Sequence, residues 1–184
     1  MLNTVKQCFF RLKVLYQIRE YLSTDIRIRL CETLVLSKLN YADTVVGGCL
    51  LGRTKRLIQR VQNSCARYCF PIPRRHHVTP YLNRSGLLNM DSRRLLHFAS
   101  LLFGLIKNRS PSYLYDKLSF TKRRSRITDR LICPLHKTAA FRGSFRYSAT
   151  KCWNNIPPPI RDSSSVNTFK LKYKKHLLML QMNK

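Results

Sequence analysis

Acidic residues are scarce in this chain. Its 184 residues include 8 Asp and Glu against 35 Lys and Arg, which gives a formal net charge of +27. With so few carboxylates, little is left for the general acid–base pairs of an enzyme. The unbalanced positive charge repels itself unless an anionic partner neutralises it. Nucleic acid is the first partner that this balance indicates, and an anionic membrane surface is the second.

The chain also lacks long hydrophobic runs. The most apolar window, residues 95–106, is far shorter than the roughly 20 residues that span a bilayer, so no membrane span is expected. Lys6 and Arg11 lie close to the start with no long apolar run beside them, which argues against a signal peptide. Seven cysteines, an odd number without the spacing of a disulfide framework, predict reduced thiols. Together these features predict an intracellular protein of the nucleus or cytoplasm that is not secreted.

Glycine-rich loops and strand patterns are missing as well. Gly47 and Gly48 have neither the lysine nor the third glycine of a phosphate-binding loop. Strand signals are weak throughout, whereas 44% of the residues are hydrophobic, which is enough for a core. We therefore predict a mainly α fold, an irregular multi-helix bundle with basic loops and little or no sheet. Its segments are expected at 1–70, at 71–118 (core helices) and at 119–184 (basic loop and C-terminal helices), within one continuous domain.

The clearest helix is predicted over residues 53–70, because Gly52 before it and Pro71 after it interrupt the pattern. Its apolar residues recur at helical spacing and are Leu57, Ile58, Val61, Cys65, Tyr68 and Cys69. Four arginines lie on a second face, well round the helix, and they are Arg53, Arg56, Arg60 and Arg67. One face is therefore predicted to be buried, and the other to be a row of guanidinium groups.

Other helices follow from the same periodicity and from capping residues. They are predicted over residues 5–21, 25–36, 80–85, 90–107, 110–118, 145–153 and 166–180. The second of them is expected to bury Ile26, Leu30, Thr33 and Leu34. Apolar residues nearly encircle the helix over 90–107, so it should be central to the core. The prolines from Pro157 to Pro159 predict a stiff extended connector.

Basic residues gather in four places, and this grouping carries the functional hypothesis. The places are the row Arg53, Arg56, Arg60 and Arg67, the cluster Arg74 and Arg75 with His76 and His77, the loop Lys122, Arg123, Arg124, Arg126 and Arg130, and the last helix with Lys170, Lys172, Lys174 and Lys175. A single row of charge is usually a solvated face. For the whole set, too few acids are available for pairing, so the sequence predicts contacts with nucleic-acid phosphates. Such contacts position a duplex without reading its sequence.

One short motif has a catalytic alternative. Tyr41-Ala42-Asp43-Thr44 faintly resembles the aromatic-Ala-Asp-Asp core of polymerase active sites. That chemistry uses two metal ions held by adjacent carboxylates and a distant third. Thr44 stands in place of the second carboxylate and no Asp-bearing strand precedes it, so a turn aspartate is favoured. No catalytic residue is predicted.

Cys65, Cys69, His76 and His77 are candidate zinc ligands, because three residues separate the two cysteines and this spacing occurs in zinc sites. Both cysteines, however, lie on the apolar face of the predicted helix, and adjacent histidines rarely bind one ion together. Core thiols beside a polar turn are therefore favoured, and no metal or cofactor is expected.

Three aromatic side chains could stack on nucleic-acid bases, namely those of Tyr68, Tyr147 and Trp153. All three lie on apolar faces of predicted helices, so core packing is the favoured interpretation.

Several motifs, taken in order, resemble the C-terminal part of non-long-terminal-repeat (LINE) retrotransposon polyproteins, and the jockey-type elements in particular. The motifs are Leu34-Val35-Leu36 with Leu39-Asn40-Tyr41-Ala42-Asp43, Arg60-Val61-Gln62-Asn63 with Cys65-Ala66-Arg67, Pro73-Arg74-Arg75 with His77-Val78-Thr79-Pro80-Tyr81-Leu82, Phe141-Arg142-Gly143-Ser144-Phe145-Arg146-Tyr147, Lys151-Cys152-Trp153-Asn154-Asn155-Ile156-Pro157, and Phe169-Lys170. Their order and spacing cover nearly the whole chain. Ser37 and Val46 depart from the family, which tends to have proline and tryptophan there.

The resemblance implies the thumb of a reverse transcriptase, an RNA-directed DNA polymerase, in residues 1–70 and the helical region after it. In that family the palm lies upstream, so the polymerase carboxylates and Mg²⁺ sites carry over onto no residue of this chain. The expected function is non-catalytic binding of template–primer or element RNA, with the upstream palm as a protein partner. Two alternatives stay open: a basic helical interaction module for acidic proteins or an anionic membrane surface, and a non-functional relic of the element.

Overall fold

A computed structural model describes residues 2–41, 43–46, 50–73, 75–121, 130–135 and 137–183 of the chain. These residues are mainly helical, and among them the only β pairing is an isolated bridge between Phe120 and Leu131. The predicted fold class is therefore confirmed. The chain divides into two compact units, the first of residues 1–43, 50–93 and 178–184 and the second of residues 44–49 and 94–177. The three-segment division after residues 70 and 118 stays a prediction.

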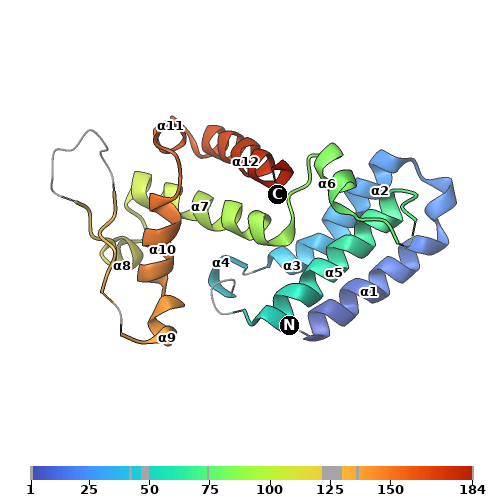
Figure 1. The fold of residues 1–184 in the computed structure, drawn as a ribbon, viewed down its shortest axis with the longest axis horizontal. Helices are drawn as coiled ribbons and strands as arrows, with labels where there is room; N and C mark the ends of the chain where they lie inside the picture. The colour runs from blue at the N-terminus through green and yellow to red at the C-terminus, as the bar shows by residue number, and fades with distance from the viewer. Residues whose placement is uncertain are drawn as a thin grey trace. The chain divides into compact units, whose positions relative to one another are not determined.

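Helices that lie side by side build the first unit, as Figure 1 shows for α1, α2 and α5. Its elements are α1 (Leu2–Gln17), a 3₁₀ turn (Arg19–Tyr21), α2 (Thr24–Leu30), a π-helical stretch (Cys31–Leu36), α3 (Ser37–Asn40), α5 (Gly52–Cys69) and α6 (Thr79–Arg84). The Ser23 side chain accepts a hydrogen bond from the backbone N–H of Ile26 and so caps the start of α2.

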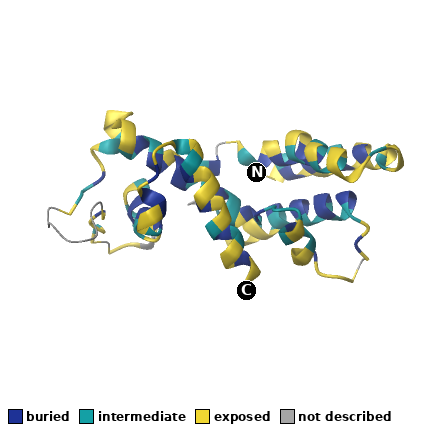
Figure 2. Cartoon of the chain, turned by 90° about the horizontal axis from the view of Figure 1, so that it is seen from above, coloured by how far each residue is buried: buried dark blue, intermediate teal, exposed yellow. Residues whose placement is uncertain are grey.

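The core of this unit combines one face each of α1, the α2–α3 segment and α5. Its buried residues are Val5, Cys8, Leu12, Leu15, Cys31, Val35, Leu36, Leu39, Ile58, Val61, Cys65, Tyr68, Cys69 and Met90. They recur every three or four residues along each helix, which places them on one side. Figure 2 shows the resulting alternation of buried and exposed residues around these helices. The predicted buried face of α5 is confirmed, with Leu57 half-buried.

The buried stripe predicted for the second helix is wrong except at Leu30, which is half-buried and packs against the core. Ile26 and Leu34 are 47% and 42% exposed, whereas Cys31 and Val35 are buried. Two apolar stripes run along this segment, and the sequence alone does not say which of them meets α1 and α5. The π-helical stretch from Cys31 to Leu36 adds a further change, because a π turn alters the angular position of every later residue.

Side-chain amides join α5 to the loop before α7 (Met90–Asn108). Gln62 is buried and its Nε2 donates to the carbonyl of Leu88 over 2.7 Å. The Gln59 Oε1 accepts from the backbone N–H of Met90 over 3.0 Å. Near the chain end, the Gln181 Oε1 accepts from the backbone N–H of Asn89 over 2.8 Å. These bonds satisfy polar groups that would otherwise be buried without a partner.

Most of α7 belongs to the second unit. The other helices of this unit are α8 (Ser112–Tyr115), α9 (Ala139–Arg142), α10 (Phe145–Asn154), α11 (Pro158–Arg161) and most of α12 (Val166–Met182). One division between the units along the chain falls within α4 (Asp43–Val46). Aromatic side chains join its helices. The rings of Phe103 and Phe169 stack at 4.5 Å between centroids, and Phe98 meets Phe145 edge-on at 6.2 Å. Trp153 is buried as predicted.

Two expectations for this unit need correction. The prolines after α10 do not form an extended connector, because Pro158 and Pro159 begin α11, where proline suits the first turn of a helix. Apolar residues do not make α7 buried all round, since Leu95 and Leu101 are 38% and 43% exposed. Ala99, Leu102 and Phe103 are buried and form the core side of the helix.

Candidate nucleic-acid interface

The α5 ridge, which we define as Arg53, Arg56 and Arg60, is exposed along one face of α5. Their spacing of three and four residues places the side chains in a row. The opposite face is in the core, where Ile58 and Val61 are 0% exposed. The row is therefore held on a helix that the rest of the first unit fixes in place.

No carboxylate neutralises the ridge within the described residues. None of its three guanidinium groups has an ion pair or hydrogen bond with another described side chain or carbonyl. Elsewhere in this unit, Arg93 pairs with Glu32 over 3.4 Å. Like charges three and four residues apart destabilise a helix by a few tenths of a kcal/mol per pair. The ridge therefore carries a small cost to stability that an external polyanion would remove.

Arg67 belongs to the same predicted row, but its guanidinium contacts the protein. It donates to the carbonyl oxygens of Pro73 and His76, both over 2.8 Å. These bonds tie the loop after α5 to the helix. Contact between Arg67 and a phosphate stays a prediction, and the structure gives this residue a positioning role for the loop.

Arg19 and Arg27 bind the C-terminal end of α5, which the sequence analysis missed. The Arg19 Nε donates to the carbonyl of Tyr68 over 2.8 Å, and an Arg27 nitrogen donates to the carbonyl of Cys69 over 3.3 Å. The last carbonyls of a helix have no partner inside it, and they carry the negative end of its dipole. No local pattern around Arg19 could have indicated this bond, because 49 residues separate it from its acceptor.

A cationic cavity of about 390 Å³ lies between the loop and α6. Its lining residues are Arg75, His76, His77, Pro80, Tyr81 and Arg84. Of the predicted cluster, Arg75, His76 and His77 are thus brought together here, whereas Arg74 lies outside the described residues. Arg84 was not predicted, and its place one helical turn after Pro80 is the signal that could have found it.

The second unit carries its own basic row. Lys170 and Lys174 are exposed on α12, together with Lys172 and Lys175, while Phe169 and Tyr173 of the same helix are buried. The predicted loop residues Lys122, Arg123, Arg124 and Arg126 lie outside the described residues.

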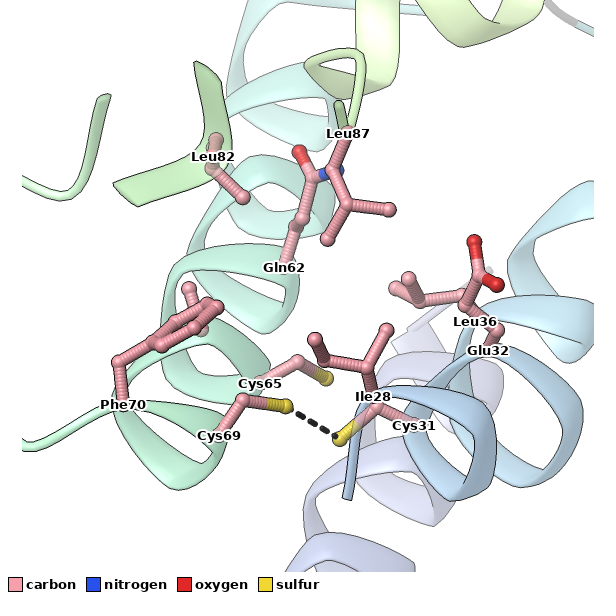
Figure 3. Close-up of a pocket in the computed structure, with 11 residues that line it drawn as sticks. Ile28, Cys31, Glu32, Leu36, Gln62, Cys65, Cys69, Phe70, Leu82 and Leu87 are labelled. Carbon is pink, nitrogen blue, oxygen red and sulfur yellow. Dashed lines mark hydrogen bonds between the residues drawn. The ribbon is translucent and has the colours of Figure 1, made fainter. Parts of the chain in front are cut away.

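The thiols of the zinc alternative lie in the core. Figure 3 shows Cys65 and Cys69 on α5 facing Cys31, with 3.7 Å between the sulfurs of Cys69 and Cys31. A hydrogen bond with Cys31 and burial raise the pKa of the Cys69 thiol, which disfavours the thiolate that binds metal. The space beside these thiols is about 10 Å³, room for one water at most. His76 and His77 are exposed on the cavity instead.

Among the described residues, no three His, Cys, Asp or Glu side chains lie close enough together to hold a metal ion. Asp43 of the polymerase-like motif is buried at the start of α4, and Tyr41 before it is 85% exposed. Of the aromatic residues considered for stacking, Tyr68 and Trp153 are buried, which confirms core packing for both, and Tyr147 is half-buried.

In comparisons with known proteins, no family model, no curated protein and no solved structure matches this chain. Among the described residues, no helix combines the length and the hydropathy that crossing a bilayer requires.

Proposed function

We propose that this chain binds the phosphate backbone of duplex nucleic acid through the α5 ridge. The observation that carries the proposal is the exposure of Arg53, Arg56 and Arg60 in one row with no carboxylate among the described residues to pair with them. The helix rises by about 10 Å between Arg53 and Arg60, which are seven steps apart along the chain. Duplex DNA carries one charge per roughly 1.7 Å of its axis, so several phosphates lie within reach of three long side chains.

The sequence resemblance supports a more specific form of this proposal. In that form the chain is a non-catalytic C-terminal region, thumb and post-thumb, of a non-long-terminal-repeat retrotransposon reverse transcriptase. It grips the template–primer or the element RNA, and the upstream palm supplies the metal-binding carboxylates. Purified chain should then give no primer extension above background while it shifts an RNA–DNA duplex at low salt. Extension activity in this chain would overturn the assignment.

The binding test compares two triple variants that lose the same charge. Arg53→Gln/Arg56→Gln/Arg60→Gln removes the ridge, and Lys6→Gln/Lys13→Gln/Arg29→Gln removes three exposed charges from α1 and α2. Affinity for a labelled DNA duplex is measured by fluorescence anisotropy over a series of salt concentrations. For wild type, six to ten phosphate contacts would give a loss of about 10³–10⁵ in affinity between 50 and 200 mM salt.

The ridge variant should lower the magnitude of the salt slope by about 2.7, that is 0.9 for each lost phosphate contact. The control variant should keep most of the slope, because its charges are not placed on one row. If both variants lost the same amount of salt slope, the ridge would contribute only through the overall positive charge of the protein and would not be a specific binding row. A wild-type affinity independent of salt would reject backbone binding altogether.

A second candidate function is a basic interaction module for anionic membrane surfaces or acidic proteins. The observation that favours it is on α1, where Phe10 and Val14 are 69% and 47% exposed beside the exposed Lys6 and Lys13. A basic helix with an exposed apolar face is typical of membrane-surface binding. Sedimentation with vesicles that contain phosphatidylserine, in competition with RNA, separates the two functions. Vesicle binding that RNA does not displace would favour the second.

A further inference from the structure

The cationic cavity combines charge with an aromatic wall, which the α5 ridge lacks. Arg75 and Arg84 are exposed at its rim, and neither guanidinium has a hydrogen bond or ion pair with another described residue. Tyr81 is half-buried in its wall, and its ring lies 5.9 Å from the ring of Phe70. A guanidinium fork matches a phosphate oxygen pair, and a tyrosine ring offers a face on which a base can stack.

Contacts within the protein hold described residues on both sides of the cavity. Arg67 donates to the carbonyls of Pro73 and His76, and the N–H of His76 donates to the carbonyl of Pro73 over 3.0 Å. On the other side, Val78 and Leu82 are buried in a small cluster that also contacts Phe70 and Tyr81. Pro73, His76 and Tyr81 are therefore held by contacts within the protein, which lowers the ordering cost of binding.

The size and the charge of the cavity select among anionic ligands. A volume of about 390 Å³ lies within the range of small-molecule sites and suits one nucleotide. Two guanidinium groups with two imidazole N–H donors favour a group of high charge. A phosphomonoester carries about −1.5 to −2 at pH 7, whereas an internal phosphodiester of a strand carries one charge.

We propose that this cavity binds a nucleoside 5′-monophosphate group, with the phosphate between Arg75 and Arg84 and the base on Tyr81. The group can come from a free nucleotide or from the 5′-phosphorylated end of a strand. The proposal rests on the proposed function in one respect, because nucleic acid supplies the second source. With this cavity, the protein would prefer a 5′-phosphorylated strand end, whereas the α5 ridge would bind any stretch of the phosphate backbone.

The test uses a short single-stranded oligonucleotide labelled at its 3′ end, with either a 5′-phosphate or a 5′-hydroxyl, at one fixed salt concentration. Wild-type protein should bind the phosphorylated oligonucleotide about tenfold more tightly in fluorescence anisotropy, because charge-assisted bonds to the dianion are lost with the hydroxyl. Arg75→Gln/Arg84→Gln should abolish this preference. Lys13→Gln/Arg29→Gln, which loses the same charge from exposed positions, should keep it.

Tyr81→Leu reports on stacking separately. It should weaken both oligonucleotides by a factor of about 5 to 150 and leave the preference for the 5′-phosphate unchanged. Because Tyr81 packs on Phe70, the thermal unfolding of Tyr81→Leu is measured to detect any loss of stability. Tyr81→Phe, which keeps the ring, is measured beside it and should bind as wild type does.

Adenosine monophosphate as competitor identifies the source. Displacement from wild type but not from Arg75→Gln/Arg84→Gln means that a free nucleotide suffices. No displacement with a retained end preference means that the strand is needed. Equal wild-type affinity for both ends, or a preference that survives Arg75→Gln/Arg84→Gln, would overturn the cavity proposal. Duplex binding by the ridge variant is measured independently of this experiment. The proposed function can therefore hold even if the cavity proposal fails, and the two failures can be told apart.

Discussion

The Arg19 Nε donates a 2.8 Å hydrogen bond to the carbonyl oxygen of Tyr68, across 49 residues of sequence. A second nitrogen of the same guanidinium lies 3.4 Å from the carbonyls of Arg67 and Phe70. One cation thus serves three carbonyls at the C-terminal end of α5 and holds the 3₁₀ turn after α1 against it. Not every basic residue of this chain is therefore free for a polyanion.

Replacing Arg19 tests this role. Arg19→Ala should lower the free energy of unfolding by about 1–3 kcal/mol, because it removes the charged donor from three carbonyls at the end of α5 and leaves only the bond from Arg27. Arg19→Lys should recover part of the loss, since it keeps the charge but not the fork. Urea unfolding followed by circular dichroism measures both. Arg29→Ala, at an exposed position of α2, should change stability by less than about 0.5 kcal/mol. Equal effects at the two positions would reject the cap.

Tyr68→Phe should raise stability, because the Tyr68 hydroxyl is buried and has no hydrogen-bond partner among the described residues. An unsatisfied buried hydroxyl costs about 1–3 kcal/mol, and phenylalanine keeps the edge-on contact with Tyr16, whose ring centroid is 5.1 Å away. We expect a gain of about 1 kcal/mol in urea unfolding. Tyr16→Phe, at a side chain 43% exposed, is the control and should be neutral. A marked loss in Tyr68→Phe would mean that the hydroxyl has a partner after all.

The limits of the sequence are clear from α5 and its neighbours. The period of Ile58, Val61 and Cys65 was enough to predict the helix and its buried face, because local spacing decides both. The bonds of Arg19 and Gln62 could not be predicted, since their acceptors lie 49 and 26 residues away. The difference between Arg60, which is exposed, and Arg67, which holds a loop, depends on where the chain goes after Pro71.

The two apolar stripes of the α2–α3 segment show a different limit. Ile26 and Leu34 on one stripe, and Cys31 and Val35 on the other, have helical spacing of equal quality. Only packing against α1 and α5 decides between them, and a sequence pattern contains no information about the partner face. The cavity could not be predicted for a similar reason, because Arg75 and Arg84 come to line one cavity only through the packing of α6.

Neighbouring leucines of α7 should differ sharply in their contribution to stability. Leu102 is 0% exposed and Leu101 is 43% exposed. Leu102→Ala should cost about 2–5 kcal/mol through lost burial and a cavity, and Leu101→Ala less than about 1 kcal/mol. The chain has one tryptophan, Trp153, which is buried in the same unit, so its fluorescence in urea reports the unfolding. Similar losses at both positions would contradict the assigned core side of α7.

Alkaline pH should destabilise the second unit through Cys152. Burial raises the pKa of this thiol from its ordinary value of 9.0 to about 12. Between these values the unfolded state loses a proton that the folded state keeps, so stability falls by about 1.4 kcal/mol per pH unit for this group. Below pH 9 the contribution is fully present. Burial also raises the pKa of Tyr173 in the same unit, which adds to the decline at higher pH.

Cys152→Ala should therefore make the decline shallower by about 1.4 kcal/mol per pH unit between roughly pH 9 and 11, although its stability at pH 7 is lower. Trp153 fluorescence in urea at each pH measures the slope. Cys133→Ala, at an exposed thiol, is the control and should retain the wild-type slope. An unchanged slope in Cys152→Ala would show that other groups cause the alkaline loss.

The basic row of α12 makes the last test of the phosphate hypothesis, because it lies in the second unit and on a helix of its own. Lys170→Gln/Lys174→Gln should lower the magnitude of the salt slope for a DNA duplex by about 1.8 if both ammonium groups contact phosphates. Lys170→Arg/Lys174→Arg keeps the charge and should keep the slope. Combining these substitutions with those of the ridge variant should add their effects on the slope, because each lost phosphate contact lowers it by the same amount. If Lys170→Gln/Lys174→Gln left the slope unchanged, this row would be a solvated face, as a run of charge on a helix usually is. Among the described residues, the α5 ridge would then be the only basic row proposed to bind the backbone.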